Sequence, residues 1–285
     1  MKAIVAYGAK DYRFCEVDTP KVGEGEILIK IEAAGICASD RAVYMGGDPW
    51  GGIESPRVPG HEFVGTVEEI GPGAEKKGFV RGDRVTAECI MPCGKCYYCK
   101  KGLYHLCDDE NGFLEGGFAE YMLLPKNALI HKVSKDIPAV EAALCEIAKK
   151  LGAAEVLNPM KEDVTKRIME LTDGVGCDIY MEATGNPASV ETGMNCLRKQ
   201  GMLFIYSVFK KKAEIDLNQI SEFKELRVIG GHLSPGAFPY TIDCLEKGKI
   251  NAKVMVTDIF ALNEIDEAMS AKKPDRVSIK TVLVP

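Results

Sequence analysis

The sequence lacks the features that would tie a protein to a membrane or to nucleic acid. None of its apolar runs approaches the roughly 18 consecutive residues that a membrane-spanning helix needs. Acidic residues outnumber basic ones, 42 to 36, which gives a formal charge of −6, and no dense block of lysine and arginine stands out. We therefore expect no membrane and no nucleic acid among its partners.

We also expect no export signal, because the apolar part of MKAIVAYGAK at the start of the sequence is too short for one. Eleven cysteines in such a chain argue against a disulfide framework and favour metal binding or catalysis in the cytoplasm. Hydrophobic residues make up 46% of the 285 residues and charged ones 27%, which is typical of a globular protein with a sizeable core.

Two regions differ in their pattern of apolar residues. Up to about residue 135, short apolar or alternating runs separated by glycine-rich turns predict a β-barrel-like domain. From residue 139, strand and helix patterns alternate, which predicts a parallel α/β sheet, and the end of the chain is predicted as strand, helix and strand. The α/β region has expected strands at 154–158, 177–183, 201–207 and 226–231 and expected helices at 161–172, 187–199 and 238–249.

Four cysteines lie close together in PCGKCYYCKKGLYHLC, namely Cys93, Cys96, Cys99 and Cys107. Four thiolates can surround a tetrahedral Zn²⁺ at ~2.3 Å and leave no open position, so a metal held there would be structural. The alternative is a set of ordinary or redox-active cysteines.

The segments ICASD and PGHEF offer ligands of a different kind. Cys37 carries a thiol, His61 an imidazole and Glu62 a carboxylate, and a mixed set suits a catalytic zinc that keeps one position for water or substrate. Asp40 is of the right kind to orient His61 through its other ring nitrogen. Ser39 is of the right kind to pass the proton of a zinc-bound alcohol to solvent, which leaves an alkoxide. Taken singly, each segment is more often an ordinary loop or turn.

The stretch from Gly60 to Ala74, GHE-x2-G-x5-G-x2-A, resembles the signature of the zinc-containing medium-chain dehydrogenases, the alcohol and polyol dehydrogenase family. CASD, GDRV, the four-cysteine loop, GGFAEYM and ATGNP follow in that family's order and spacing. The resemblance implies Cys37 and His61 as catalytic zinc ligands, Glu62 as a ligand or exchanging partner, Ser39 as the proton relay and Asp40 as the carboxylate behind the histidine.

The resemblance also implies a substrate, two cofactors and a further ligand. The substrate would be a small alcohol or polyol, and the cofactors would be Zn²⁺, catalytic and structural, and NAD(P), which accepts the hydride. In polyol-type members a second carboxylate ligand follows an alanine-rich segment, a position held here by Glu146. In helical phase Glu146 falls on the polar face with Lys149, so its role depends on whether that helix forms. Family members commonly form dimers or tetramers through the α/β domain, so a homo-oligomer stays open.

The implied fold is α/β with a β-rich part. A GroES-like β-barrel catalytic domain would comprise residues 1–138 and 254–285, and a Rossmann-like domain residues 139–253. The Rossmann-like part departs from the family, because no G-x-G-x-x-G follows a first strand. Glu146 runs at once into IAKKLGA, which the family reaches only after two more strand–helix units, on the order of sixty residues. We therefore expect an incomplete parallel sheet that lacks its first two strand–helix units.

The junction AVEAALCEIAKKLGAAEVLN, residues 139–158, keeps one continuous apolar face and is predicted to begin as a helix. Thr184 and Ser207, at the carboxyl ends of surviving strands, are the candidate contacts to the nicotinamide, with plain turn residues as the alternative. We expect a dehydrogenase by family with weak or no NAD(P) binding and little activity. The alternatives are a non-catalytic zinc-binding scaffold or relic, and a rebuilt sheet that binds a cofactor elsewhere.

Overall fold

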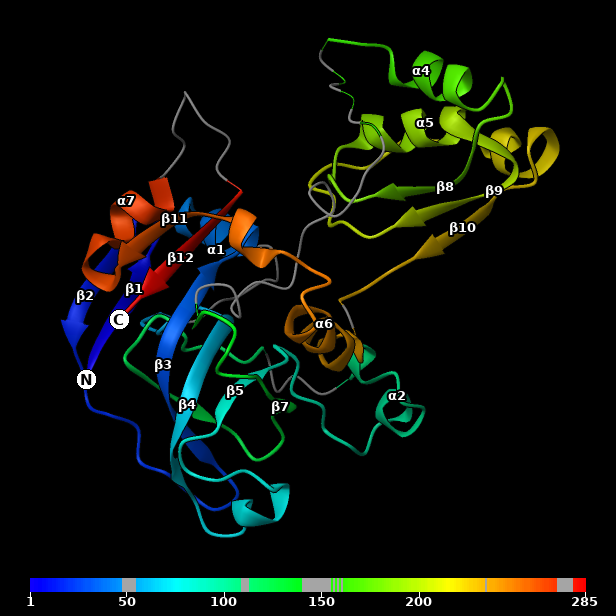
Figure 1. The fold of residues 1–285 in the computed structure, drawn as a ribbon. Helices are drawn as coiled ribbons and strands as arrows, with labels where there is room; N and C mark the ends of the chain where they lie inside the picture. Colours follow the sequence, from blue (N-terminus) through cyan, green and yellow to red (C-terminus); the bar gives the residue numbers. More distant parts are fainter. Residues whose placement is uncertain are drawn as a thin grey trace. The chain divides into compact units, whose positions relative to one another are not determined.

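The computed structural model describes residues 1–47, 55–108, 113–139, 155, 157, 159, 161–233, 235–270 and 279–285. The chain divides into two compact units, one made of Met1–Gly152 with Pro235–Pro285 and the other of Ala153–Ser234 (Figure 1). Within the described ranges, no helix has both the length and the apolar character to cross a membrane.

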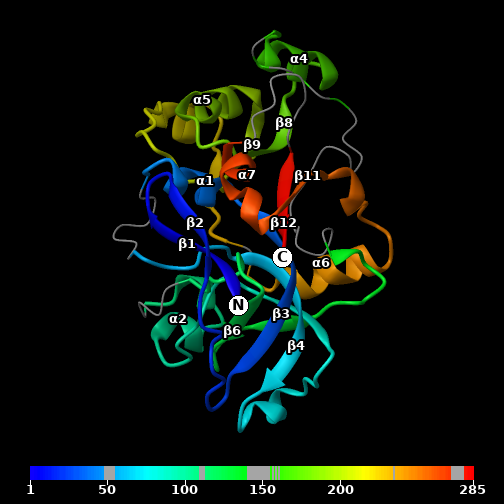
Figure 2. The ribbon, with the colours of Figure 1, turned by 90° about the vertical axis from the view of Figure 1, so that its left-hand side faces the viewer.

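The first unit is built on a seven-stranded sheet in the order β11-β12-β3-β4-β5-β7, with β6 also paired to β3. Neighbouring strands are antiparallel except for β11 and β12, which run parallel. Figure 2 shows β3 and β4 side by side. The strands are β3 (Ile27–Ile36), β4 (Glu62–Ile70), β5 (Arg84–Ala87), β6 (Tyr121–Leu124), β7 (Ile130–Lys132), β11 (Val256–Ala261) and β12 (Lys280–Val284).

The central strand β3 explains where the core of this unit lies. It pairs with β4, β6 and β12, so its residues are covered on nearly every side, and eight of its ten residues are buried. Ile27 and Ile29 are fully buried and join the main cluster with Phe63 and Phe118. A separate antiparallel pair, β1 (Lys2–Gly8) and β2 (Asp11–Glu16), contributes Ile4 and Tyr12 to the same cluster. The predicted β-rich domain is therefore present.

Among its described residues, the first unit has four short α-helices: α1 (Ala38–Tyr44), α2 (Tyr97–Lys100), α6 (Ala237–Glu246) and α7 (Ile265–Ser270). Ile242 of α6 packs in a second cluster with Val64, Val133 and Val282 of this unit. The predicted division at residues 139–253 would include α6 and stays a prediction; in the structure the helix packs against strands of the first unit. An amphipathic helix carries no signal that tells which sheet its apolar side will cover.

In the part of the second unit that the structure describes, three parallel strands lie in the order β10-β9-β8, namely β8 (Cys177–Glu182), β9 (Leu197–Ile205) and β10 (Arg227–Gly230). Two helices lie within the ranges predicted for them, α4 (Val164–Leu171) and α5 (Pro187–Cys196). The predicted strand–helix alternation is confirmed for this stretch. Helix α5 ends at Cys196, earlier than the predicted Lys199, because the fully buried Leu197 already begins β9.

Side-chain caps and one close contact fix these helices. Asp163 accepts a hydrogen bond from the amide of Lys166 at the start of α4, and Asn186 accepts one from Ala188 at the start of α5. Helix α5 lies close to β8 because Gly193 has no Cβ, which would overlap the ring of Tyr180. Val190, Met194, Leu197, Leu203 and Leu226 form the small core beneath α5.

The opposite face of this sheet is exposed. The register pairs Ile179 with Met202, Met181 with Phe204, and Phe204 in turn with Ile229, so these side chains share one face. Ile179 is 58% and Met181 61% exposed. The strand predicted at 154–158 lies outside the described residues except for positions 155 and 157, which are not in a strand. The helix predicted from residue 139, with Glu146, also lies outside them beyond Ala139.

Candidate functional site

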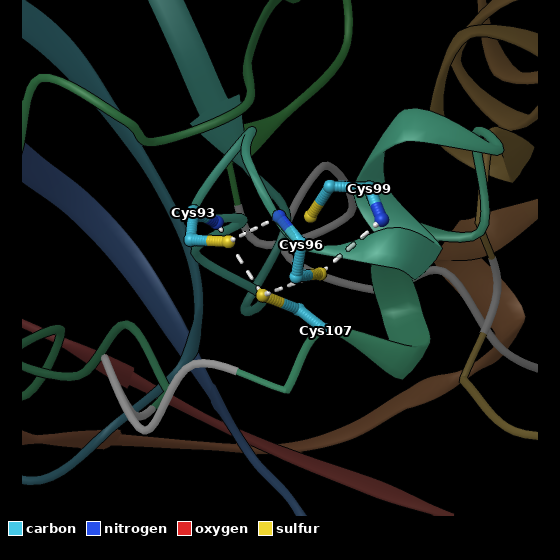
Figure 3. A group of neighbouring side chains, drawn as sticks. All are labelled: Cys93, Cys96, Cys99 and Cys107. Carbon is cyan, nitrogen blue, oxygen red and sulfur yellow. Dashed lines mark hydrogen bonds between the residues drawn. The ribbon is translucent and has the colours of Figure 1, made fainter.

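The four thiols of the cysteine loop converge on one point (Figure 3). Cys96 precedes helix α2, and Cys107 follows a short 3-10 helix, η2 (Tyr104–Leu106). All four sulfur atoms lie within 4.8 Å of one another, and the Sγ atoms of Cys96 and Cys107 are 3.9 Å apart. A tetrahedron of ~2.3 Å Zn–S bonds has edges of about 3.8 Å, so this donor set fits a closed zinc site.

Backbone amides favour negative charge on these sulfur atoms. The amide of Cys96 donates to Cys93 Sγ at 3.3 Å, and that of Cys99 to Cys96 Sγ at 3.4 Å. Hydrogen bonds from the amides of Cys99 and Asp108 lower the pKa of Cys96 to about 6. Loss of solvent, and then hydrogen bonds with the other thiols, raise the pKa of Cys99 to about 12. The backbone amides thus favour a thiolate in this cluster, and a bound cation would favour ionisation of the remaining thiols.

A second cluster forms where the end of β3 meets the start of β4. Gly35 pairs with Glu62 in the antiparallel register, which brings Cys37 close to His61 and Glu62. The ligand atoms of these three residues lie within 4.8 Å of one another. Gly60 makes this turn possible, since its φ is +98° and a Cβ there would overlap the ring of Phe118. A thiol, an imidazole and a carboxylate at this spacing match a zinc site with one open position.

Asp40 links the histidine to helix α1. Its Oδ2 accepts from the amide of Cys37 at 2.7 Å, and its Oδ1 lies 3.4 Å from His61 Nδ1. Burial alone would lower the pKa of His61, but hydrogen bonds and charge from Asp40 and Cys37 outweigh it and raise the pKa to about 11. Asp40 thus faces Nδ1 of the imidazole, which leaves Nε2 as the atom that a cation would bind. Ser39 lies beside them in the first turn of α1 and is half-buried.

Lys280 is a member of this cluster that the sequence patterns did not indicate. Its Nζ lies 2.5 Å from Glu62 Oε2, and the two side chains are 14% and 23% exposed. Since Lys280 begins β12, which pairs with β3, the C-terminal strand reaches the same end of the sheet. The ammonium group competes for the carboxylate that a metal would use. The only signal in the sequence is a lone lysine at the start of an apolar strand, which is too common to identify it.

Thr184 and Ser207 are brought together by a carboxylate that the sequence patterns also missed. Glu182, the last residue of β8, is fully buried. It accepts from the amide and hydroxyl of Thr184, at 2.8 and 2.6 Å, and from the hydroxyl of Ser207. The amide of Gly185 donates to Ser207 Oγ at 2.9 Å, which joins the loops that follow β8 and β9. Both hydroxyl hydrogens are thus directed at Glu182, so the two side chains can offer a ligand only an oxygen lone pair.

Comparison with protein families matches about three quarters of the chain to two models. Residues 23–135 match the alcohol dehydrogenase GroES-like domain, and residues 139–247 match the zinc-binding dehydrogenase domain. The X-ray structure of 2R,3R-butanediol dehydrogenase from Bacillus subtilis has a TM-score of 0.86 with this chain at 26% identity. That match covers 100% of this chain and 99% of the other. The fold is therefore the GroES-like and Rossmann-like pair expected from the sequence.

Two relatives are similar over almost their whole length. Erythritol/L-threitol dehydrogenase of Mycolicibacterium smegmatis is 35% identical over 353 residues, with 100% of this chain and 98% of the relative covered. L-threonine 3-dehydrogenase of Pyrococcus abyssi is 33% identical, with 97% and 96% covered. The first alignment is longer than the 285 residues of this chain, by about two strand–helix units of roughly 30 residues each. These matches show that the chain belongs to the zinc-containing medium-chain alcohol and polyol dehydrogenases.

Proposed function

We propose that this chain retains the zinc chemistry of an alcohol or polyol dehydrogenase but binds NAD(P) weakly or not at all, so that turnover is slow or absent. The observation that carries this is the second unit, whose described residues form a sheet of three strands, β10-β9-β8. The whole sequence contains no G-x-G-x-x-G. The surplus length of the Mycolicibacterium alignment agrees with a loss of the first strand–helix units.

The missing segment matters because of where a dinucleotide gets its binding energy. In Rossmann-like folds the pyrophosphate lies against glycine-loop amides and the N-terminus of the first helix, which stabilise its negative charge. Thr184 and Ser207 would remain on the nicotinamide side, but their hydroxyl hydrogens are already donated to Glu182. Two oxygen lone pairs cannot replace the amides that bind the pyrophosphate, so we expect the affinity for NAD(P) to be well below that of a complete site.

The first unit keeps the residues that act on the alcohol. Cys37 and His61 would hold the metal, with Glu62 as a third ligand or as an exchanging partner shared with Lys280. When bound, zinc supplies a Lewis acid that lowers the pKa of the alcohol. Asp40 holds the imidazole in place, and Ser39 would take the hydroxyl proton toward solvent. The proposed substrate class is a small vicinal diol or amino alcohol, since the named relatives act on erythritol, L-threitol and L-threonine.

A zinc-binding scaffold without catalysis is the second candidate, and the four-thiol cluster favours it. That cluster fits a closed structural site whose geometry does not involve the nucleotide domain. Both candidates suit a reducing cytoplasm, because eleven cysteines and two thiol-containing metal sites require reduced sulfur. A homo-oligomer is compatible with either.

Two measurements separate these readings. A fluorescence titration with NADH, followed by a turnover assay with erythritol, tests the nucleotide site: micromolar binding with turnover would overturn the proposal. Metal analysis tests the zinc sites. Two zinc ions per chain support the retained dehydrogenase chemistry, whereas a single ion that disappears in a Cys96→Ser variant supports the scaffold.

A further inference from the structure

Tyr104 connects the four-cysteine loop to the start of helix α6. It opens η2, between the ligand residues Cys99 and Cys107. Its hydroxyl accepts a hydrogen bond from the amide of Gly236 at 2.6 Å and donates to Glu88 Oε1 at 3.3 Å. Gly236 precedes α6, in the stretch where the chain returns to the first unit at Pro235. One side chain of the metal loop therefore holds the backbone at that return point.

Glu88 makes this a two-point attachment. It follows β5, is 3% exposed, and its Oε1 also lies 3.1 Å from His131 Nε2 of β7. The ring of His131 stacks on Phe238 in the first turn of α6, with ring centroids 5.4 Å apart and an interplanar angle of 20°. A buried carboxylate is unstable unless it keeps its hydrogen-bond partners. Glu88 therefore holds the rings of Tyr104 and His131 in place. The start of α6 is thus held by two aromatic residues that share one anchor.

Helix α6 has no side-chain cap of its own to hold its N-terminus. Its N-cap is Gly236, which has a φ of +70° and offers no side-chain oxygen to the first-turn amides. The amide of Gly236 itself is bonded to Tyr104 and not to a neighbour in sequence. Ordering of this helix start therefore depends on a side chain from another part of the unit.

The loop that carries Tyr104 has little packing to hold it in place. None of residues 93–108 is buried, and Tyr97, Leu103 and Leu106 are 66%, 42% and 40% exposed. Its helices α2 and η2 contain four and three residues, too short to be stable alone. A loop without a core of its own is ordered by the metal that its thiolates bind. The position of Tyr104 thus follows the state of the four-cysteine site.

We propose that the four-cysteine loop is a metal-dependent latch on helix α6. Metal bound by Cys93, Cys96, Cys99 and Cys107 fixes the loop, the loop fixes Tyr104, and the Tyr104 hydroxyl fixes the amide of Gly236. Loss of this metal releases the start of α6, while Ile242 further along the helix stays packed in its cluster. The metal site would then keep the start of helix α6 ordered as well as its own loop. This proposal is independent of NAD(P) binding.

Hydrogen exchange of the full chain, read by mass spectrometry over residues 235–246, tests the latch. Tyr104→Phe removes both hydrogen bonds of the hydroxyl, the one from the Gly236 amide and the one to Glu88, so we expect exchange in this segment to rise roughly two- to tenfold while the zinc content is unchanged. Cys96→Ser, which removes a ligand, should raise exchange in the same segment at least as much. Tyr97→Phe is the matched control, because Tyr97 lies in the same loop and is 66% exposed; it should change neither exchange nor metal content.

The decisive comparison is the double variant. If the metal acts through Tyr104, adding Cys96→Ser to Tyr104→Phe should raise exchange in residues 235–246 little further. Peptides from β3 report global opening and should stay protected in all variants, which distinguishes a released latch from a misfolded chain. Exchange in 235–246 that does not respond to Cys96→Ser, or that responds equally with and without the Tyr104 hydroxyl, would overturn the proposal.

Discussion

The ammonium group of Lys280 lies 2.5 Å from the Oε2 atom of Glu62, so the carboxylate of the mixed metal cluster already has a cationic partner within the protein. The two residues belong to β12 and β4, both in the sheet that contains β3. The pair gives Glu62 two alternative partners, the lysine and a metal. Whether Glu62 binds a metal therefore depends on how strongly the metal competes with Lys280 for its carboxylate.

Removing the lysine should shift that competition toward the metal. In Lys280→Met, Glu62 loses its counter-charge, and we expect the mixed site to bind Co²⁺ or Zn²⁺ about tenfold more tightly, equivalent to roughly 1.4 kcal/mol. Chelator competition followed by the cobalt absorbance measures this. Lys132→Met is the control, since it removes another lysine–carboxylate pair, with Asp83 at 2.8 Å, that is away from the cluster. Weaker metal binding in Lys280→Met would contradict the competition.

Asp40 should act on the metal through His61 without binding it. Asp40→Asn keeps the shape but removes the charge that faces His61 Nδ1, and replacing such a partner typically costs 10–100-fold in metal affinity. We expect one zinc ion to be lost more readily while the four-cysteine site keeps its own. Metal analysis after graded dialysis against a chelator tests this. Asp11→Asn, in an exposed pair with Arg13, serves as the control. Equal retention of both ions in Asp40→Asn would count against this role.

Much of the fold could be predicted from the sequence because its signals are local. Period-two and period-3.6 patterns placed β8, α5 and β10, and glycine-rich turns marked the barrel. The clustering of the cysteine ligands also follows from short spacing along the chain. The association of α6 with the barrel did not follow, because it depends on which of two apolar surfaces the helix meets.

The missed members of the sites are residues whose role arises only from contacts far apart in sequence. Lys280 reaches Glu62 across more than two hundred positions, and Tyr104 reaches Gly236 across 132. Glu182 looks like the polar end of an apolar strand until the loops after β8 and β9 turn back onto it. No spacing rule in one sequence reports such pairs. The position of Glu146 remains a prediction, since it lies outside the described residues.

Glu182 should make the second unit sensitive to acid. Burial raises the pKa of a carboxyl, but hydrogen bonds from Ser207 and Thr184 outweigh it here and lower the pKa of Glu182. Because the folded pKa lies below the ordinary value of about 4.3, the ionised group stabilises the fold at neutral pH. That stabilisation is lost as the pH falls through the folded pKa.

Glu182→Gln tests this sign. At pH 7 we expect the variant to lose about 2 kcal/mol of unfolding free energy, the usual range for hydrogen bonds to a charged group. Chemical denaturation at pH 7, 5 and 3 should show the gap to the unmodified chain narrowing toward pH 3. Glu191→Gln, on helix α5 and exposed, is the control and should show no gap. A gap that is constant with pH would mean that the charge of Glu182 contributes nothing.

The exposed apolar face of the three-stranded sheet should govern self-association of the second unit. Ile179 and Met181 lie on this face with 58% and 61% exposure, and large exposed apolar patches promote association. Ile179→Lys should leave the unfolding free energy within about 0.5 kcal/mol, because the side chain is mostly in water. It should also lower light scattering and the apparent mass in sedimentation at high protein concentration.

The matched control for this face is Leu203, on the covered side of the same sheet and 1% exposed. Leu203→Ala should cost about 2–5 kcal/mol through the cavity it leaves, and should raise association by unfolding the unit. Ile179→Lys is therefore expected to lower association at nearly unchanged stability, whereas Leu203→Ala is expected to lower stability and raise association. If Ile179→Lys destabilised the chain as much as Leu203→Ala, the face would be part of a core, and the sheet would be covered more completely than its described residues indicate.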